Sequence, residues 1–398
     1  MKKSGLKASS LSSKIFQTTM IASSMAVLLA SCQQSPMAGL AESSTRINDA
    51  AAKASASAKS GNAKPPWIFT AKAADEISMM TYNVENLFDT EQDADREDYT
   101  NLPLSLKQNK AHRDFCKKMN VPKYREECLT KDWNDDFLEA KMRNLAEVVL
   151  DLDGGMGPDV LLLQEVENIS VLSQWNKKYL SKANYQTLVL LEGFDERGID
   201  TALLSRFPLK GKPTLHKIPF DLKKIGETDE TKAKSRGILE ATLLSPKKKE
   251  MTFFIVHLPS QGNPTGMRKQ ATDFLLSLMK KKNHFVAAGG DFNITKEEEE
   301  EQGYFKNMIQ NQFEVSHFYG CPGCEGTYNH KKRWSFLDAV VFSKDFAKMG
   351  FQIQPNQIDV VRYNPNYLYR DSYPKFFKTE DLTGASDHFP LYMRLSEK

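Results

Sequence analysis

The sequence predicts an α/β fold built from layers of strands and helices. Short apolar runs rich in β-branched and aromatic residues alternate along the chain with longer segments that show the apolar repeat of amphipathic helices. Strands interleaved with helices are typical of sheets that are covered by helices. The 398 residues allow one large α/β domain or two average domains, and no internal repeat is evident.

The individual elements follow from these patterns. Strands are expected at residues 77–82, 159–164, 185–191, 201–204, 237–244, 251–256, 284–288, 336–342 and 389–395. Helices are expected at residues 136–152, 169–181, 267–281 and 299–311. Two polar segments, 89–133 and 355–385, interrupt the alternation. We interpret both as insertions within a domain that spans residues 76–398.

The N-terminal residues 1–31 have the pattern of an export signal. Four lysines precede an apolar run from Met20 to Ala30, which is too short to span a bilayer. The run ends in L-A-S-C, so Cys32 resembles the lipidated cysteine of bacterial lipoproteins; an incidental cysteine beside an ordinary cleavage site is the alternative. Gln33 in place of Asp favours, by the same resemblance, the outer membrane. We therefore expect export and a lipid anchor only.

Residues 32–75 are expected to form a flexible linker, because they are rich in Ala, Ser, Lys and Gly and hold little that could build a core. Without residues 1–32, which carry four Lys and no acids, the charge balance is 54 − 4 = 50 basic against 51 acidic residues. Bulk charge therefore gives no argument for nucleic-acid binding. Local basic runs are usually solvated, although the run Lys331, Lys332 and Arg333 lies close to a candidate site residue in sequence.

Four cysteines remain in the exported part: Cys116, Cys128, Cys321 and Cys324. An even number in an exported chain favours two disulfides, and we expect the local pairs 116–128 and 321–324. The C-P-G-C motif could instead be a redox pair or half of a zinc site, but Pro-Gly suits a tight turn and a structural staple.

Polar residues recur directly after apolar strand runs. Asn83 and Glu165 follow two such runs, His257 ends a third, and Asp291 and Asn293 follow a fourth in G-G-D-F-N. Ligand sites of α/β sheets gather at strand ends, so these side chains are candidates for one site. Taken singly, each residue also has a structural interpretation, such as a turn cap, a surface ion pair or a core imidazole.

Asp338 differs from these residues because it lies within an apolar run, W-S-F-L-D-A-V-V-F. A buried carboxylate is costly without a cationic or hydrogen-bonding partner. We expect that partner to be His388, while Arg236 is the structural alternative. Asp387 adjoins His388 but points to the opposite side of an extended chain, so it is a poor partner for that ring.

If Glu165, Asp291, Asp338 and Asp387 converge, their mutual repulsion calls for a cation. Oxygen and amide ligands without thiolates favour a hard divalent ion, Mg²⁺ first, with Mn²⁺ or Ca²⁺ as alternatives. Carboxylates, imidazoles and such an ion suit the hydrolysis of a phosphate ester.

The order of the motifs is more specific than any one of them. The chain reads N-V-E-N, L-L-L-Q-E-V-E-N, R-G-I-D-T-A-L-L-S-R, V-H-L-P-S-Q, G-G-D-F-N, F-L-D-A-V-V-F-S and S-D-H-F-P. Over residues 77–396 it resembles the endonuclease/exonuclease/phosphatase superfamily, which has the deoxyribonuclease-I-like fold. The resemblance implies a four-layer α/β sandwich of two mixed β-sheets flanked by helices.

The resemblance also implies roles for the matching positions. Asn83 and Glu165 correspond to the metal-binding pair, and Asp387 lies near the metal. Asp291 and Asn293 correspond to residues that contact the scissile phosphate and the attacking water.

Proton transfer is implied for His388, as general base or acid oriented by Asp338. His257 corresponds to the second imidazole of the deoxyribonuclease, sphingomyelinase and inositol phosphatase branches, which abasic-site endonucleases lack. Asp200 is the nearest candidate for its acidic partner, although the spacing to the following S-R fits poorly. Arg236 either binds a phosphate or pairs with an acid.

The substrate is less well determined than the chemistry. The first hypothesis is a nuclease that cleaves DNA or RNA. The second is a sphingomyelinase-like or inositol-phosphatase-like hydrolase of lipid or small-molecule phosphate esters, and the third is a catalytically silent binding module. We expect a monomer that meets the membrane through its anchor alone.

Overall fold

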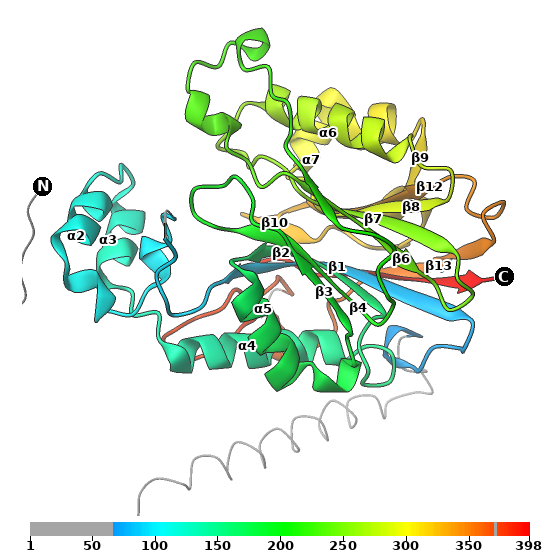
Figure 1. The fold of residues 1–398 in the computed structure, drawn as a ribbon, viewed down its shortest axis with the longest axis horizontal. Coiled ribbons are helices and arrows are strands. Elements are labelled where there is room, and N and C mark those ends of the chain that lie inside the picture. The colour runs from blue at the N-terminus through cyan, green and yellow to red at the C-terminus, as the bar shows by residue number, and fades with distance from the viewer. Residues whose placement is uncertain (1–66, 95, 370–371) are drawn as a thin grey trace, which may run out of the picture. The chain divides into compact units, whose positions relative to one another are not determined.

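Two six-stranded β-sheets packed face to face form the centre of the computed structural model, which describes residues 67–94, 96–369 and 372–398 (Figure 1). The first sheet has the order β13-β14-β1-β2-β4-β3 and the second β5-β6-β7-β8-β12-β9. Only β1–β2 and β7–β8 pair in parallel, so both sheets are mixed. The expected fold class, a four-layer α/β sandwich, is confirmed.

The strands of the first sheet are β1 (Glu76–Leu87), β2 (Val160–Val166), β3 (Thr187–Leu190), β4 (Asp200–Ser205), β13 (Phe351–Val360) and β14 (Leu391–Glu397). Those of the second are β5 (Thr214–His216), β6 (Ile238–Leu244), β7 (Glu250–His257), β8 (Phe285–Asp291), β9 (Phe313–Val315) and β12 (Asp338–Ser343). A separate hairpin consists of β10 (Tyr328–His330) and β11 (Arg333–Ser335).

Helices cover the outer face of each sheet. Figure 1 shows α4 (Asp135–Leu150) and α5 (Ile169–Tyr179) on the first sheet and α6 (Thr265–Met279) on the second. The side chain of Asn134 caps α4 by accepting a hydrogen bond from the Phe137 amide at 3.2 Å, which satisfies one of the free N–H groups of the first turn. The central strands read as continuous apolar runs because helices and the partner sheet bury both of their faces.

All nine expected strands are present, but two expectations about segments are wrong. The helix expected at residues 299–311 is broken: α7 (Lys296–Gln302) ends at Gly303, whose φ of 65° is left-handed, and a π-helical turn follows. The expected insertion at residues 355–385 begins inside β13, an edge strand. Its pairing with β14 shifts between Ile353 and Ile358, and Pro355 lies in this bulge.

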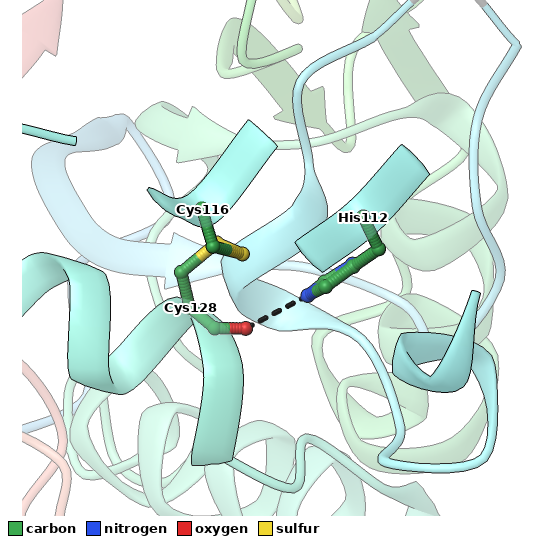
Figure 2. Close-up of side chains that lie close together, drawn as sticks. All are labelled: His112, Cys116 and Cys128. Carbon is green, nitrogen blue, oxygen red and sulfur yellow. Dashed lines mark hydrogen bonds between the residues drawn. A yellow bond between two sulfur atoms is a disulfide. The ribbon is translucent and has the colours of Figure 1, made fainter. Parts of the chain in front are cut away.

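The segment 89–133 forms a small helical insertion. Its helices α2 (Lys110–Lys117) and α3 (Pro122–Thr130) are joined by a disulfide between Cys116 and Cys128, with 5.6 Å between the Cα atoms. Figure 2 shows His112 beside this disulfide, with Nε2 2.9 Å from the Cys128 carbonyl oxygen. A second disulfide joins Cys321 to Cys324 across the Pro-Gly turn. Both are the pairs that the sequence places closest together.

The packed domain starts before residue 76, so the expected linker boundary at residue 75 is too late. Ile68 is fully buried in the core beneath the first sheet, and the Thr70 carbonyl oxygen accepts a hydrogen bond from Arg394 at 2.5 Å. The expected signal peptide and Cys32 lie outside the described residues. Among the residues described, no helix is both long and apolar enough to cross a bilayer.

We predict that His317→Phe makes the fold less sensitive to acid. The His317 ring stacks on Phe336 with centroids 4.3 Å apart, and burial lowers its pKa to about 3. In the unfolded chain the same imidazole has a pKa of about 6.5, so between these values the unfolded state binds the extra proton. The free energy of unfolding should therefore fall as the pH falls from about 6.5 towards 3.

Urea unfolding of the wild type and the variant between pH 7 and pH 4 would measure this contribution. The exposed His330→Phe is the matched control and should keep the wild-type slope. Equal slopes for all three proteins would contradict the prediction.

Candidate active site

The ends of four strands bring the candidate residues together. In the second sheet, Asp291 at the end of β8 lies opposite His257 at the end of β7 and opposite Asp338 at the start of β12. In the first sheet, β1 carries Asn83 and β2 carries Glu165 at neighbouring ends of a parallel pair. The parallel pairs thus present polar side chains at one edge of the sandwich.

His388 and Asp338 form a buried contact. The His388 Nδ1 atom lies 2.7 Å from Asp338 Oδ2, and the two side chains are 6% and 0% exposed. The Nε2 atom lies 4.0 Å from Asp291 Oδ2. Although burial opposes a charged ring, the carboxylates of Asp338, Asp387 and Asp291 raise the pKa of His388 well above its usual value.

The loop around His388 is held to both neighbouring strands. The Ser386 hydroxyl donates to the Asn83 carbonyl oxygen at 2.7 Å and accepts from the His388 amide at 3.1 Å. The ring of Tyr328 packs against His388 with centroids 4.9 Å apart. The Asp338 amide donates to Thr327 Oγ1 at 3.0 Å, so the segment before β10 fixes the partner carboxylate as well.

The Asn83 side chain links two carboxylates across the sheets. Its Nδ2 atom lies 3.3 Å from Glu165 Oε1 and 3.2 Å from Asp291 Oδ2. The amide oxygen accepts from the Glu85 backbone, so Asn83 turns a donor rather than a metal ligand toward the acids. Glu165 has a φ of 66°, and its Oε2 accepts from the Asn86 amide at 3.0 Å where β1 bulges.

Asn293 belongs to the turn that follows β8. It has a left-handed φ of 54°, its amide donates to Asp291 Oδ1 at 2.7 Å, and its side chain donates to the Leu258 carbonyl oxygen at 3.0 Å. These bonds fix the orientation of Asp291. Burial raises the pKa of Asp291 to about 7, and the nearby carboxylates of Asp338 and Glu165 add to the rise.

His257 lies against the same acids. Its Nε2 atom is 3.6 Å from Asp291 Oδ2 and 3.8 Å from Glu165 Oε1. Burial, with the positive charges of Arg236 and Arg197, lowers the pKa of His257 well below its usual value, so the ring is neutral. Its Nδ1 atom is buried without a hydrogen-bond partner in the described residues.

The expectation that Asp200 holds His257 is wrong. Asp200 Oδ1 instead accepts from the Gly193 amide at 2.9 Å, and no carboxylate oxygen of Asp200 lies within 4.0 Å of the ring nitrogens. Arg236 is buried and pairs with an acid, since its Nε atom lies 3.2 Å from Asp195 Oδ2. That pair places Arg236 close to the site without giving it a free guanidinium.

The donor set fits a hard divalent cation. Burial raises the pKa of Asp387, and the negative charge of Glu165 adds to this rise. Three carboxylates, those of Glu165, Asp291 and Asp387, thus destabilise one another's charged forms in a pocket that offers oxygen ligands and no thiolate. Glu165 and Asp387 are the residues that would hold the ion.

Two further charged residues of this region were missed by the sequence analysis. Lys141 of α4 is 1% exposed, and its Nζ atom lies 2.7 Å from the Ala385 carbonyl oxygen and 3.3 Å from Glu85 Oε2. Burial raises the pKa of Glu85 to about 7. The signal was the position of Lys141 on the apolar stripe of α4, between Leu138 and Leu145.

The fold and this arrangement define a class of phosphoric ester hydrolases. The sequence profile of the Endonuclease/Exonuclease/phosphatase family matches residues 123–397, and the chain belongs to that family. Members of the superfamily hydrolyse phosphoric esters and generally use divalent metal ions. No curated protein matches the chain.

Solved structures share the fold at low sequence identity. An endonuclease/exonuclease/phosphatase family protein from Bacteroides thetaiotaomicron superposes with a TM-score of 0.50 and 14% identity, covering 81% of this chain and 98% of that chain. A mannosyl-6-phosphatase from the same organism gives 0.48 and 14%, covering 80% and 99%. D. rerio TDP2, humanized by 14 mutations, gives 0.47 and 14%, covering 81% and 100%. The likeness concerns the fold alone.

We predict that Lys141→Met lowers the free energy of unfolding by about 1–3 kcal/mol, because the Ala385 carbonyl oxygen and Glu85 lose a charged donor in a dry environment. Urea unfolding would measure the loss. Lys178→Met is the matched control, since its pair with Glu139 lies at the surface and should contribute less than about 1 kcal/mol. Equal losses in the two variants would contradict the prediction.

Proposed function

We propose that the protein is an exported, divalent-metal-dependent phosphodiesterase, and specifically a nuclease that hydrolyses DNA or RNA with an imidazole-activated water. The observation that carries this proposal is the buried contact between His388 and Asp338. It occupies Nδ1 of the ring and leaves Nε2 directed toward Asp291. A ring held in this way can accept a proton from water or deliver one to a leaving oxygen.

Each residue of the site has a distinct part in this scheme. Asp338 fixes the tautomer of His388 and stabilises its protonated form. Asn83 and Asn293 orient Glu165 and Asp291, and the neutral His257 donates or accepts a hydrogen bond at the scissile phosphate. A bound Mg²⁺, or Mn²⁺ or Ca²⁺, would supply positive charge to the phosphate oxygens as a Lewis acid.

A basic hairpin beside the site supports the choice of a polynucleotide. Tyr328 of β10 pairs with His388 through an isolated backbone bridge, so the hairpin starts at the catalytic ring. Its tip carries Lys331 and Lys332, both exposed and both with left-handed φ values. Exposed lysines next to the reaction centre suit a phosphate backbone, which needs charge more than base recognition.

The export signal in residues 1–31 and a lipid anchor at Cys32 belong to the same proposal, supported by the N-terminal pattern of the sequence. They direct the enzyme toward extracellular nucleic acid. The proposed protein works as a monomer, since the contacts that carry this scheme are all made within one chain.

We predict that Asp338→Asn lowers kcat by about 10²–10⁴, the usual contribution of acid–base catalysis, because an amide cannot hold His388 in the same tautomer and charge state. Steady-state cleavage and circular dichroism would be measured together. The exposed Asp345→Asn on the loop after β12 should leave both unchanged. Near wild-type turnover in Asp338→Asn would remove Asp338 from its assigned role.

The decisive experiment is plasmid-DNA and RNA breakdown by the protein without its first 32 residues, with Mg²⁺, with a chelator, and with His388→Ala. We expect metal-dependent cutting that the substitution abolishes. Hydrolysis of a small or lipid phosphate ester by protein that leaves both polynucleotides intact would contradict the nuclease assignment. Cutting that survives His388→Ala would contradict the mechanism.

A further inference from the structure

The loop that follows β1 holds a second group of carboxylates, which the catalytic scheme does not use. Its members are Asp89, Asp93, Asp98 and Glu167. The Asp89 amide donates to Glu167 Oε2 at 2.7 Å, and the Asp93 amide donates to Asp98 Oδ2 at 2.8 Å. We call these four residues the loop cluster.

Asn168 ties the cluster to the start of α5. Its Oδ1 atom caps the helix by accepting from the Val171 amide at 2.9 Å. The Nδ2 atom donates to Asp89 Oδ2 at 3.0 Å and to Asp93 Oδ2 at 3.3 Å. The two aspartates therefore turn one carboxylate oxygen each toward the same amide group, and their charges face a common region.

Two members of the loop cluster are buried. Glu167 is 1% exposed and Asp98 is 2% exposed. Asp98 Oδ1 is buried and has no hydrogen-bond partner in the described part of the chain. Burial raises the pKa of Asp98 to about 6, and the charges of Asp93 and Asp89 add to the rise, so this oxygen faces the other acids. A buried, uncompensated carboxylate is costly in free energy.

No side-chain cation compensates the loop cluster. Within residues 67–94, 96–369 and 372–398, no Lys or Arg nitrogen lies within 4.0 Å of its carboxylates. Arg96, which lies in the same loop, instead donates to Glu192 at 2.9 Å and to the Asp195 carbonyl oxygen at 2.9 Å. Four negative charges thus share one region with only amide donors.

We infer that the loop cluster is a Ca²⁺ site that stabilises the connection between β1 and α5. Ca²⁺ takes six to eight oxygen ligands in flexible geometry, which suits acids drawn from an irregular loop, whereas Mg²⁺ demands a rigid octahedron. A solvent-open hollow lined by Asp89, Asp93, Asn168 and Glu192 gives the ion access. The unpartnered oxygen of Asp98 becomes a ligand.

Binding must draw the loop together. No three of these carboxylates have oxygens within 4.8 Å of one another in the described residues, and the same is true of the acids of the candidate active site. Like charges separate when no cation lies between them. Ca²⁺ should therefore tighten residues 89–98 as well as bind to them.

The test uses the full chain, stripped of metal and then held in excess Mg²⁺ so that the catalytic acids are occupied. Thermal unfolding is followed as Ca²⁺ is added. We expect a saturable rise in Tm with a Kd of about 10⁻⁴–10⁻³ M, the range of extracellular Ca²⁺ modules. Amide exchange of residues 89–98 should slow over the same range.

Asp98→Asn separates a ligand from a structural residue. Without Ca²⁺ the variant should be at least as stable as the wild type, because it removes one repelled charge, yet its response to Ca²⁺ should weaken by at least roughly tenfold. Asp114→Asn, an exposed acid of α2, is the matched control and should respond as the wild type does.

Terbium luminescence gives an independent measurement. The indole of Trp133 donates to the Phe88 carbonyl oxygen at 3.1 Å, next to Asp89, so it can sensitise Tb³⁺ in the loop cluster. Ca²⁺ should displace this emission in the wild type and in Asp114→Asn. An unchanged Tm in the wild type, or an equal Ca²⁺ response in Asp98→Asn, would overturn the inference. Neither readout depends on phosphoric ester hydrolysis, so the proposed function stands or falls separately.

Discussion

The buried contact between His388 and Asp338 joins the two sheets of the sandwich at its catalytic edge. His388 directly precedes β14 of the first sheet, and Asp338 begins β12 of the second. The bond between Asn83 and Asp291 crosses between the sheets in the same way. Because both contacts are short and buried, the relative position of the sheets sets the geometry of the site, and the apolar side chains between the sheets act on catalysis through it.

The polar edge of the sandwich is held under backbone constraint. Glu85, Asn86 and Glu165 all have positive φ where β1 and β2 leave their regular register. Such conformations persist only when surrounding contacts stabilise them. Here the contacts include Lys141, which connects the bulge of β1 to the segment before His388. The helix layer therefore supports the site as well as the core.

Sequence reasoning could predict the fold and most of the site because both follow from strand patterns. Asp338 and His388 could be paired from the cost of burying a lone carboxylate within an apolar run. Asp200 could not be placed, because its oxygen is captured by the Gly193 amide, a contact that depends on how the loop before β4 turns. Lys141 was missed because one lysine on a helix is usually solvated, and only the three-dimensional packing shows its two oxygen partners.

The outer edge of the first sheet has a consequence for the protein at high concentration. β13 lies at that edge, and an exposed edge strand is a template on which the strand of another copy can add. The bulge between Ile353 and Ile358 interrupts its regular pairing, and Pro355 has no N–H group to offer. An incoming strand could pair over only a few residues on either side. The irregular edge thereby protects the fold from sheet-to-sheet aggregation.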